Sequence, residues 1–149
     1  MNIRERTVIE RPAAEVWPFI ITPEHFIRWN DKVLSMEAEG SFRLNQPFVT
    51  HYRWGRRELQ CQTLATAIEE GRMLELRHTN CIGSGIRRDM EVVERVTLQE
   101  RSGRTTVTKD VIIKNHDVPW PIIPLIWCIT RFGRPAGKDR LKEMCEQNL

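Results

Sequence analysis

The feature that most constrains this 149-residue chain is a two-residue turn at Ser102-Gly103. A turn of this length joins two antiparallel strands and fixes which residues of the strands face each other. On one face it predicts the pairs Leu98–Val107, Val96–Lys109, Glu94–Val111 and Val92–Ile113. On the other face it predicts Arg95–Asp110, Glu91–Lys114 and Thr97–Thr108. Opposite-charge and Thr–Thr pairs each stabilise a hairpin by roughly 0.2–1 kcal/mol, and three of them occurring together favour this register.

Two further turns, at Gly55-Arg56 and Glu70-Gly71, extend the antiparallel pattern. The first predicts the pairs Phe48–Thr63, Thr50–Cys61, Tyr52–Leu59 and Arg53–Glu58. The second predicts Thr63–His78, Ala65–Leu76 and Ala67–Leu74. The segment from Thr79 to Gly85 contains Gly83-Ser84-Gly85 and is expected to be a loop. From Val33 onward the sequence therefore predicts a curved antiparallel sheet.

The N-terminal part predicts one strand followed by two short helices. Residues 2–9 alternate apolar and polar side chains, which is typical of a strand. Pro12 suits the first turn of a helix, and Thr22 with Pro23 gives the N-cap and first position of the next helix. That second helix is expected to end at Asn30-Asp31.

The last thirty or so residues predict a long helix that lies across the sheet. Proline is tolerated in the first helical turn, so we place its start between Pro121 and Pro124. Apolar residues recur every three or four positions from there to Met144, and Pro135 predicts a kink or a junction of two helices. The small residues Gly133, Ala136 and Gly137 leave the middle of this face nearly bare. Close packing against the sheet and an unfilled space are equally compatible with that pattern.

Composition excludes several function classes. The 23 basic and 20 acidic residues give a net charge of +3, too balanced to indicate nucleic-acid binding. The N-terminal residues include no apolar run typical of a signal peptide, and Val118 to Ile129 is shorter than the ~20 residues that span a bilayer. The spacing of Cys61, Cys81, Cys128 and Cys145 fits no zinc site, and we expect reduced thiols in a cytoplasmic protein. No metal or cofactor is predicted.

The opening of the chain resembles the START-like superfamily, also called Bet v 1-like or SRPBCC. The resemblance is carried by Arg11-Pro12-Ala13-Ala14-Glu15-Val16-Trp17, then Pro23-Glu24 and Trp29-Asn30. It implies an α+β helix-grip fold over residues 1–149 as a single domain. In that fold a seven-stranded curved antiparallel sheet surrounds a C-terminal helix, with two short helices after the first strand, in the order β-α-α-β6-α. It also implies binding or transport of lipids and other hydrophobic molecules, or polyketide aromatase/cyclase activity.

The predicted concave face is mostly apolar or small, with a few polar exceptions. The run Cys61, Thr63, Ala65, Ala67 is too small to reach a helix with glycine at its centre, which favours a cavity between the two. Glu94 and Lys109 lie diagonally across one strand pair, within reach of each other. Three interpretations stay open: charges that reach solvent, a buried ion pair, and anchors for a ligand head group. The candidate ligand-binding residues are Thr50, Tyr52, Cys61, Thr63, His78, Glu94, Lys109, Ile126 and Gly133.

The leading functional hypothesis is a protein that binds or transports a small hydrophobic ligand between the sheet and the C-terminal helix. The alternative is a polyketide cyclase/dehydratase-type enzyme with His78 or Glu94 as acid–base, although no spacing shows that such groups converge and no catalytic residue is assigned. A second alternative is a module that presents Trp120 and Trp127 to a protein or a membrane. The oligomeric state is open.

Overall fold

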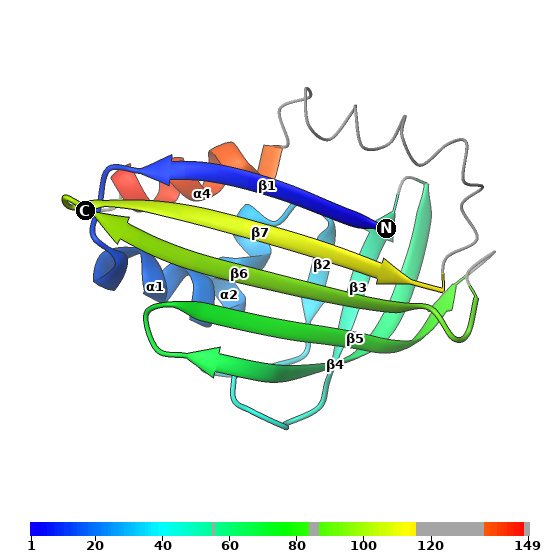
Figure 1. Cartoon of the computed structure of the whole chain (residues 1–149). Coiled ribbons are helices and arrows are strands. Elements are labelled where there is room, and N and C mark those ends of the chain that lie inside the picture. Colours follow the sequence, from blue (N-terminus) through cyan, green and yellow to red (C-terminus); the bar gives the residue numbers. More distant parts are fainter. Residues whose placement is uncertain (55, 84–86, 116–135, 148–149) are drawn as a thin grey trace.

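The computed structural model of the chain describes residues 1–54, 56–83, 87–115 and 136–147. Its elements follow the predicted order of one strand, two helices, six strands and a helix (Figure 1). The strands are β1 Asn2–Ile9, β2 Val33–Met36, β3 Phe48–Trp54, β4 Arg57–Glu69, β5 Met73–Gly83, β6 Glu91–Arg101 and β7 Arg104–Lys114. The helices are α1 Ala13–Ile21, α2 Pro23–Trp29 and α4 Ala136–Gln147. The predicted α+β fold class is confirmed.

The seven strands form one antiparallel sheet in the order β1-β7-β6-β5-β4-β3-β2. Every pair predicted from the Ser102-Gly103 turn is present, and so is every pair predicted from Gly55-Arg56. Ser102 and Gly103 both have positive φ, 55° and 76°, as a type I′ hairpin turn requires. The register of the β6–β7 hairpin was therefore readable from the turn alone.

The hairpin between β4 and β5 departs from its predicted register close to the turn. Thr63–His78 and Ala65–Leu76 pair as predicted, but Leu74 pairs with Ile68 rather than with Ala67. The turn contains one residue more than expected, and an irregularity between Ala65 and Ala67 compensates for it. A bulge of this kind changes which residues point inward. Ile68, not Ala67, consequently packs against the core.

Strand β5 continues to Gly83, so the predicted loop from Thr79 is wrong over its first five residues. A second irregularity lies here, between the pairs Gln60–Ile82 and Gln62–Thr79. Asn80 occupies the extra position with φ of 51°, a conformation that asparagine tolerates better than most residues. The inserted residue shifts the alternation, so that Cys81 is buried while Asn80 is exposed.

This second bulge places Cys81 on the same face as Cys61, and the two form a disulfide. The prediction of reduced thiols is wrong for this pair. Cys145 is free and buried, and burial raises the pKa of its thiol to about 12. Cys128 lies outside the described residues.

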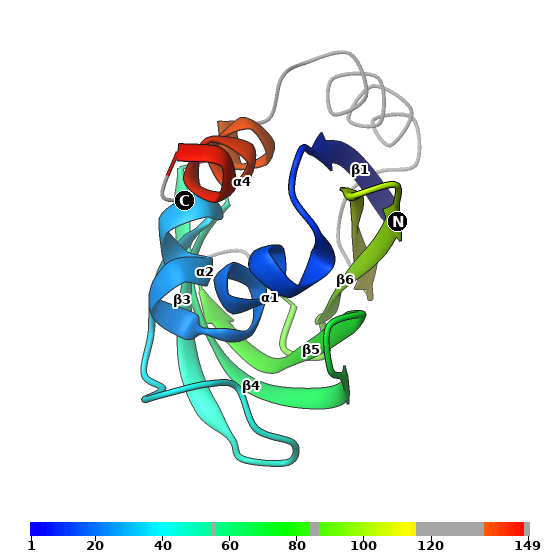
Figure 2. The same ribbon diagram turned by 90° about the vertical axis from the view of Figure 1, so that its left-hand side faces the viewer.

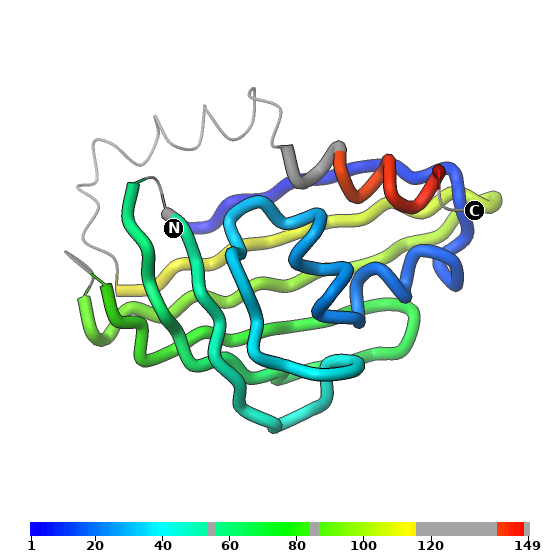
Figure 3. Tube along the Cα trace, turned by 180° about the vertical axis from the view of Figure 1, so that it is seen from behind, coloured from blue at the N-terminus to red at the C-terminus, as the bar shows by residue number. Residues whose placement is uncertain are grey.

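The sheet curls around the helices, as Figure 2 shows when the molecule is viewed from the side. Helices α1 and α2 lie within the curl, and α4 crosses its open side beside β1, α1 and α2. The main core lies between them and includes Val16, Ile20, Phe26, Leu76 and Leu141, each at most 2% exposed. Figure 3 shows the same arrangement from behind. The helices therefore cover one part of the concave face.

Only the end of the predicted C-terminal helix lies within the described residues. Its inward positions are as predicted, since Leu141 and Met144 are buried. The predicted start between Pro121 and Pro124, the junction at Pro135 and the small residue Gly133 lie outside the described residues.

Candidate functional site

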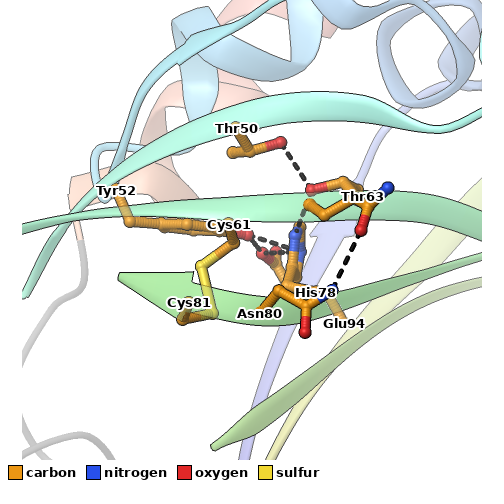
Figure 4. The surroundings of a disulfide bond; sticks show 9 residues. Thr50, Tyr52, Cys61, Thr63, His78, Asn80, Cys81 and Glu94 are labelled. Atoms are coloured by element: carbon orange, nitrogen blue, oxygen red, sulfur yellow. Dashed lines mark hydrogen bonds and ion pairs between the residues drawn. A yellow bond between two sulfur atoms is a disulfide. The ribbon is translucent and has the colours of Figure 1, made fainter. Parts of the chain in front are cut away.

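Three polar side chains meet on the concave face of the sheet. The hydroxyl of Tyr52 on β3 lies 2.6 Å from Nε2 of His78 on β5 and donates a hydrogen bond to Oε1 of Glu94 on β6. His78 Nε2 lies 3.1 Å from that same carboxyl oxygen. His78 is fully buried and Glu94 is 2% exposed. Figure 4 shows the three groups converging above the disulfide.

Two threonines support the other side of the imidazole ring. Thr63 Oγ1 lies 2.7 Å from His78 Nδ1, and the hydroxyls of Thr63 and Thr50 lie 2.7 Å apart. Both threonines are fully buried. Their cross-strand neighbours place them here, because Thr50 pairs with Cys61 and Thr63 pairs with His78. Both ring nitrogens of His78 therefore have partners, which fixes the orientation of the ring.

The second oxygen of Glu94 contacts residues from helix α2 and strand β7. Asn30, at the C-terminal cap of α2, donates from Nδ2 to Glu94 Oε2 over 3.2 Å. Lys109 Nζ lies 3.8 Å from the same oxygen and 5.6 Å from the ring centroid of Trp29. The diagonal Glu94–Lys109 contact agrees with the predicted strand register.

Burial shifts the pKa values of His78 and Glu94 in the directions that favour their neutral forms. Desolvation lowers the pKa of His78 to about 3, and the positive charge of Lys109 acts in the same direction. Desolvation raises the pKa of Glu94, opposed by Lys109 and by the hydrogen bond from Asn30. His78 is therefore neutral near pH 7, and its contact with Glu94 is a hydrogen bond rather than an ion pair.

A neutral His78 has one ring proton, and its position depends on Glu94. When Glu94 is ionised, an Nε2 proton on His78 and the hydroxyl of Tyr52 both point to the carboxylate. When Glu94 is protonated, His78 Nε2 accepts a hydrogen bond and its proton lies on Nδ1, facing Thr63. The cluster can therefore hold or release one proton with little movement of heavy atoms, as a general acid or base requires.

A cavity of about 110 Å³ adjoins this cluster. Its apolar wall is formed by side chains of β1, β4, β6 and β7 together with Met1. Its polar side is formed by Asn30, Tyr52, Glu94 and Lys109, with Lys32 and Arg53 nearby. The apolar lining residues are Met1, Ile3, Leu59, Val92, Val111 and Ile113. The cavity is thus mainly apolar with one polar corner.

The disulfide lies behind the apolar wall of this cavity. Cys61 and Cys81, each 1% exposed, pack in one cluster with Leu59, Val92 and Ile113. Because these three residues also line the cavity, the covalent link between β4 and β5 supports the wall. Cys61 was predicted as a ligand contact, but its sulfur is bonded to Cys81.

The structure brings together six of the nine predicted ligand-binding residues. These are Thr50, Tyr52, Thr63, His78, Glu94 and Lys109, although only Tyr52, Glu94 and Lys109 line the cavity. Ile126 and Gly133 lie outside the described residues, as do Trp120 and Trp127 of the interaction hypothesis. Sequence reasoning missed Asn30, Lys32 and Ile3. The Trp29-Asn30 motif indicates the fold, whereas its position at a helix end does not mark the Asn30 side chain as a site residue.

The small residues Ala65 and Ala67 of β4 do not line this cavity. Ala65 is fully buried, packs in the main core and forms an isolated bridge with Leu44. Ala67 does not face inward, because of the bulge beside it. Neither residue lines the cavity, which lies instead against β1, β6 and β7. The space predicted between these small residues and the C-terminal helix involves Gly133, which lies outside the described residues, and it stays a prediction.

Comparison with known proteins shows what the fold resembles. No protein-family model matches the sequence, and no curated protein resembles it significantly in sequence. A START superfamily protein from Mycobacterium smegmatis matches with a TM-score of 0.74 at 12% identity, covering 99% of both chains. The chain has the START-like helix-grip fold.

Other solved structures agree with this fold. The START-like match extends to Ara h 8.0201, with a TM-score of 0.65, 14% identity and 99% coverage of both chains. DynU16, from the dynemicin biosynthetic locus, matches with a TM-score of 0.66 at 17% identity. That match covers 99% of this chain, which spans 48% of the DynU16 chain. At these identities the comparisons show fold, so function has to be argued from the cavity.

Membrane insertion through a helix finds no support in the described part of the chain. None of its helices is long and apolar enough to cross a bilayer.

Proposed function

We propose that this protein binds a small, largely apolar molecule in the cavity against β1, β6 and β7. The polar end of the ligand would lie at the corner formed by Tyr52, Glu94 and Lys109. The observation that carries the proposal is the separation of the lining into an apolar wall and one polar corner. Such a lining desolvates the body of a ligand and orients it through a few polar contacts.

The size of the cavity limits the ligand. An apolar cavity of about 150 Å³ holds a benzene ring, whereas drug-sized ligands occupy about 300–1,000 Å³. A cavity of about 110 Å³ is smaller than that and therefore accommodates a short alkyl chain or the end of a longer molecule. Binding would draw on burial of apolar surface, about 25 cal/mol per Å².

The START-like fold supports the proposal as an analogy. The resemblance implies hydrophobic ligands in a space enclosed by the curled sheet, and the cavity here lies on the concave face. The location of DynU16 in a biosynthetic locus is compatible with a ligand from secondary metabolism. The proposal itself is argued from the cavity lining and not from that comparison.

Native mass spectrometry of freshly purified protein tests the proposal directly, by detecting a co-purified molecule of low mass. A matched pair of variants on β7 adds specificity. Val111→Phe fills the cavity, whereas Ile112→Phe adds the same ring on the opposite face of the strand. We expect Val111→Phe to lose the bound molecule and Ile112→Phe to retain it. Equal retention by both variants would contradict binding in this cavity.

An acid–base enzyme is the second candidate. The observation that favours it is the Tyr52 hydroxyl, which lines the cavity and contacts both His78 and Glu94. A substrate in the cavity would contact the Tyr52 hydroxyl, which is hydrogen-bonded to His78 and Glu94, and this pair can hold or release a proton. Turnover of a bound molecule that is lost in Glu94→Gln, with the fold and binding retained, would identify the protein as an enzyme. Binding without turnover would leave the ligand-binding function.

A further inference from the structure

The ammonium group of Lys109 lies at the polar corner without a hydrogen-bond acceptor among the described residues. The side chain of Lys109 is only 14% exposed. Its nearest carboxylate oxygen, Oε2 of Glu94, is 3.8 Å away, beyond the 2.7–3.2 Å range of an N–H···O hydrogen bond. Its other contact is the face of the Trp29 ring. Lys109 therefore has donor capacity directed at the cavity that it lines.

The neighbouring acceptors are already used by other donors. Oε1 of Glu94 accepts from Tyr52 and contacts His78, and Oε2 accepts from Asn30. Glu5 pairs with Lys109 across β1 and β7, yet no ion pair joins the two within the described structure. The polar corner therefore has an unused hydrogen-bond donor in Lys109, whereas both oxygens of its carboxyl group, Glu94, already have partners.

The charged residues that line the cavity also favour a negatively charged ligand group. Lys32, Arg53 and Lys109 are cationic, and Glu94 is the one carboxyl group among the described lining residues. Arg53 forms an exposed ion pair with Glu58 at 3.4 Å. Burial of a cation is costly unless it is well paired, and the 3.8 Å contact with Glu94 is the one carboxylate contact of Lys109 among the described residues. A negatively charged group from the ligand would offset that cost.

We infer that the ligand is an amphipathic carboxylate, with its carboxylate bound by Lys109 and its apolar body against Ile3, Val92 and Val111. This inference rests on the proposed binding function and narrows its ligand class. Lys32, on the segment after α2, adds positive charge on the same side of the cavity. A primary amine would be repelled by these cations, and an alcohol would gain only a neutral hydrogen bond.

The test compares three probes that share an eight-carbon chain and differ in head group: octanoate, octan-1-ol and octylamine. Calorimetry at neutral pH measures their affinities for the unmodified protein. We expect octanoate to bind at least about tenfold more tightly than octan-1-ol, as a charge-assisted hydrogen bond provides. Octylamine should bind most weakly. Because this comparison uses the unmodified protein, it holds even if a Lys109 variant does not fold.

Two variants locate the preference. Lys109→Met retains the length of the side chain and should reduce octanoate affinity to that of octan-1-ol, with octan-1-ol changed less than about twofold. Lys114→Met removes the same charge from an exposed position on the other face of β7 and should leave the preference intact.

The remaining outcomes contradict either the carboxylate assignment or the proposed binding function. Octan-1-ol or octylamine binding as tightly as octanoate would overturn the carboxylate assignment and leave the apolar cavity as the binding site. A preference that survives Lys109→Met would also overturn it. If none of the three probes binds, the proposed binding function itself fails.

Discussion

The hydroxyl of Tyr52 lies 2.6 Å from Nε2 of His78, and the two rings stand at 89° to each other. Tyr52 belongs to β3, which pairs with β2 and β4 but not with β5. The side chain therefore reaches over β4 to contact β5 and β6. This contact is possible because the sheet curls, which brings inward side chains of non-adjacent strands together. The polar cluster is thus a product of sheet curvature as much as of local sequence.

Removal of the Tyr52 hydroxyl should destabilise the fold. Tyr52→Phe retains the ring but leaves His78 and Glu94 each without one hydrogen-bond partner in a buried site. We expect a loss of about 1–3 kcal/mol in the free energy of unfolding, measured by urea denaturation. The exposed bond of Thr66 to Glu75 provides a control, since Thr66→Val should change stability by less than about 0.5 kcal/mol. Equal effects of the two variants would argue against a buried network.

His78 should remain uncharged well below neutral pH. Its pKa in the folded protein is lowered to about 3 by burial, whereas in the unfolded chain it is about 6.5. The unfolded state therefore binds more protons between these values, so the contribution of His78 to stability is complete above about pH 6.5 and decreases towards pH 3. Between about pH 8 and pH 5 the imidazole resonances, assigned through a His78→Gln variant, should remain those of a neutral ring. A titration midpoint near 6.5 would mean that burial does not lower the pKa of His78.

Glu94 should give the opposite dependence on pH. Burial raises its pKa in the folded state, so its favourable contribution is complete below the unfolded pKa and is lost as the pH rises through the folded pKa. Glu94→Gln lacks this loss. The variant should therefore gain stability relative to the unmodified protein as the pH is raised from about 4.5 to about 8. Denaturation of both proteins at each pH measures their free energies of unfolding. A variant that loses stability relative to the unmodified protein as the pH rises would refute the raised pKa of Glu94.

Glu94→Ala separates charge from hydrogen bonding at the same position. It leaves Asn30, His78 and Tyr52 without their shared acceptor. We expect it to lose stability at both pH values, by about 1–3 kcal/mol or more.

The disulfide should contribute substantially to stability. Cys61 and Cys81 are 20 residues apart in sequence, and closing a loop of that size stabilises a protein by about 3 kcal/mol in the chain-entropy view. We expect a loss of that order in a Cys61→Ser/Cys81→Ser double variant, measured by urea denaturation. A Cys145→Ser variant, which leaves the bridge in place, is the control for loss of a buried thiol.

Counting thiols tests whether the bridge forms. Protein unfolded without reductant should show two fewer thiols than protein that has first been reduced. The same number in both samples would mean that Cys61 and Cys81 are reduced. Because persistent disulfides are rare in reducing compartments, the count also tests the predicted cytoplasmic location.

Turn chemistry explains how much of this fold could be predicted. The turns at Ser102-Gly103 and Gly55-Arg56 set the registers of two hairpins without error, because each pair follows from the one before it. The register of β4–β5 was right in the middle and wrong at both ends. Bulges near Ala65 and at Asn80 each change the alternation, and nothing in the local composition marks either one as a bulge.

The same bulges limited prediction of the site. The reduced thiols were expected from the predicted cytoplasmic location, and the predicted strand ended before Thr79. Continued without a bulge, the register would place Asn80 opposite Cys61 and turn Cys81 to the outer face, so it does not indicate a disulfide either. The Glu94–Lys109 contact, by contrast, depended on a hairpin with no irregularity and could be predicted. Convergence of Tyr52 with His78 and Glu94 could not, because it depends on how strongly the sheet curls.

Tyr52 is the single tyrosine of the chain, and its side chain lines the cavity. A tyrosine labelled with ¹³C on the ring would accordingly yield signals from that one location, with no assignment experiment required. Entry of a guest molecule, a change in protonation of the neighbouring carboxyl, and reduction of the sulfur bridge would each be observable at this built-in reporter.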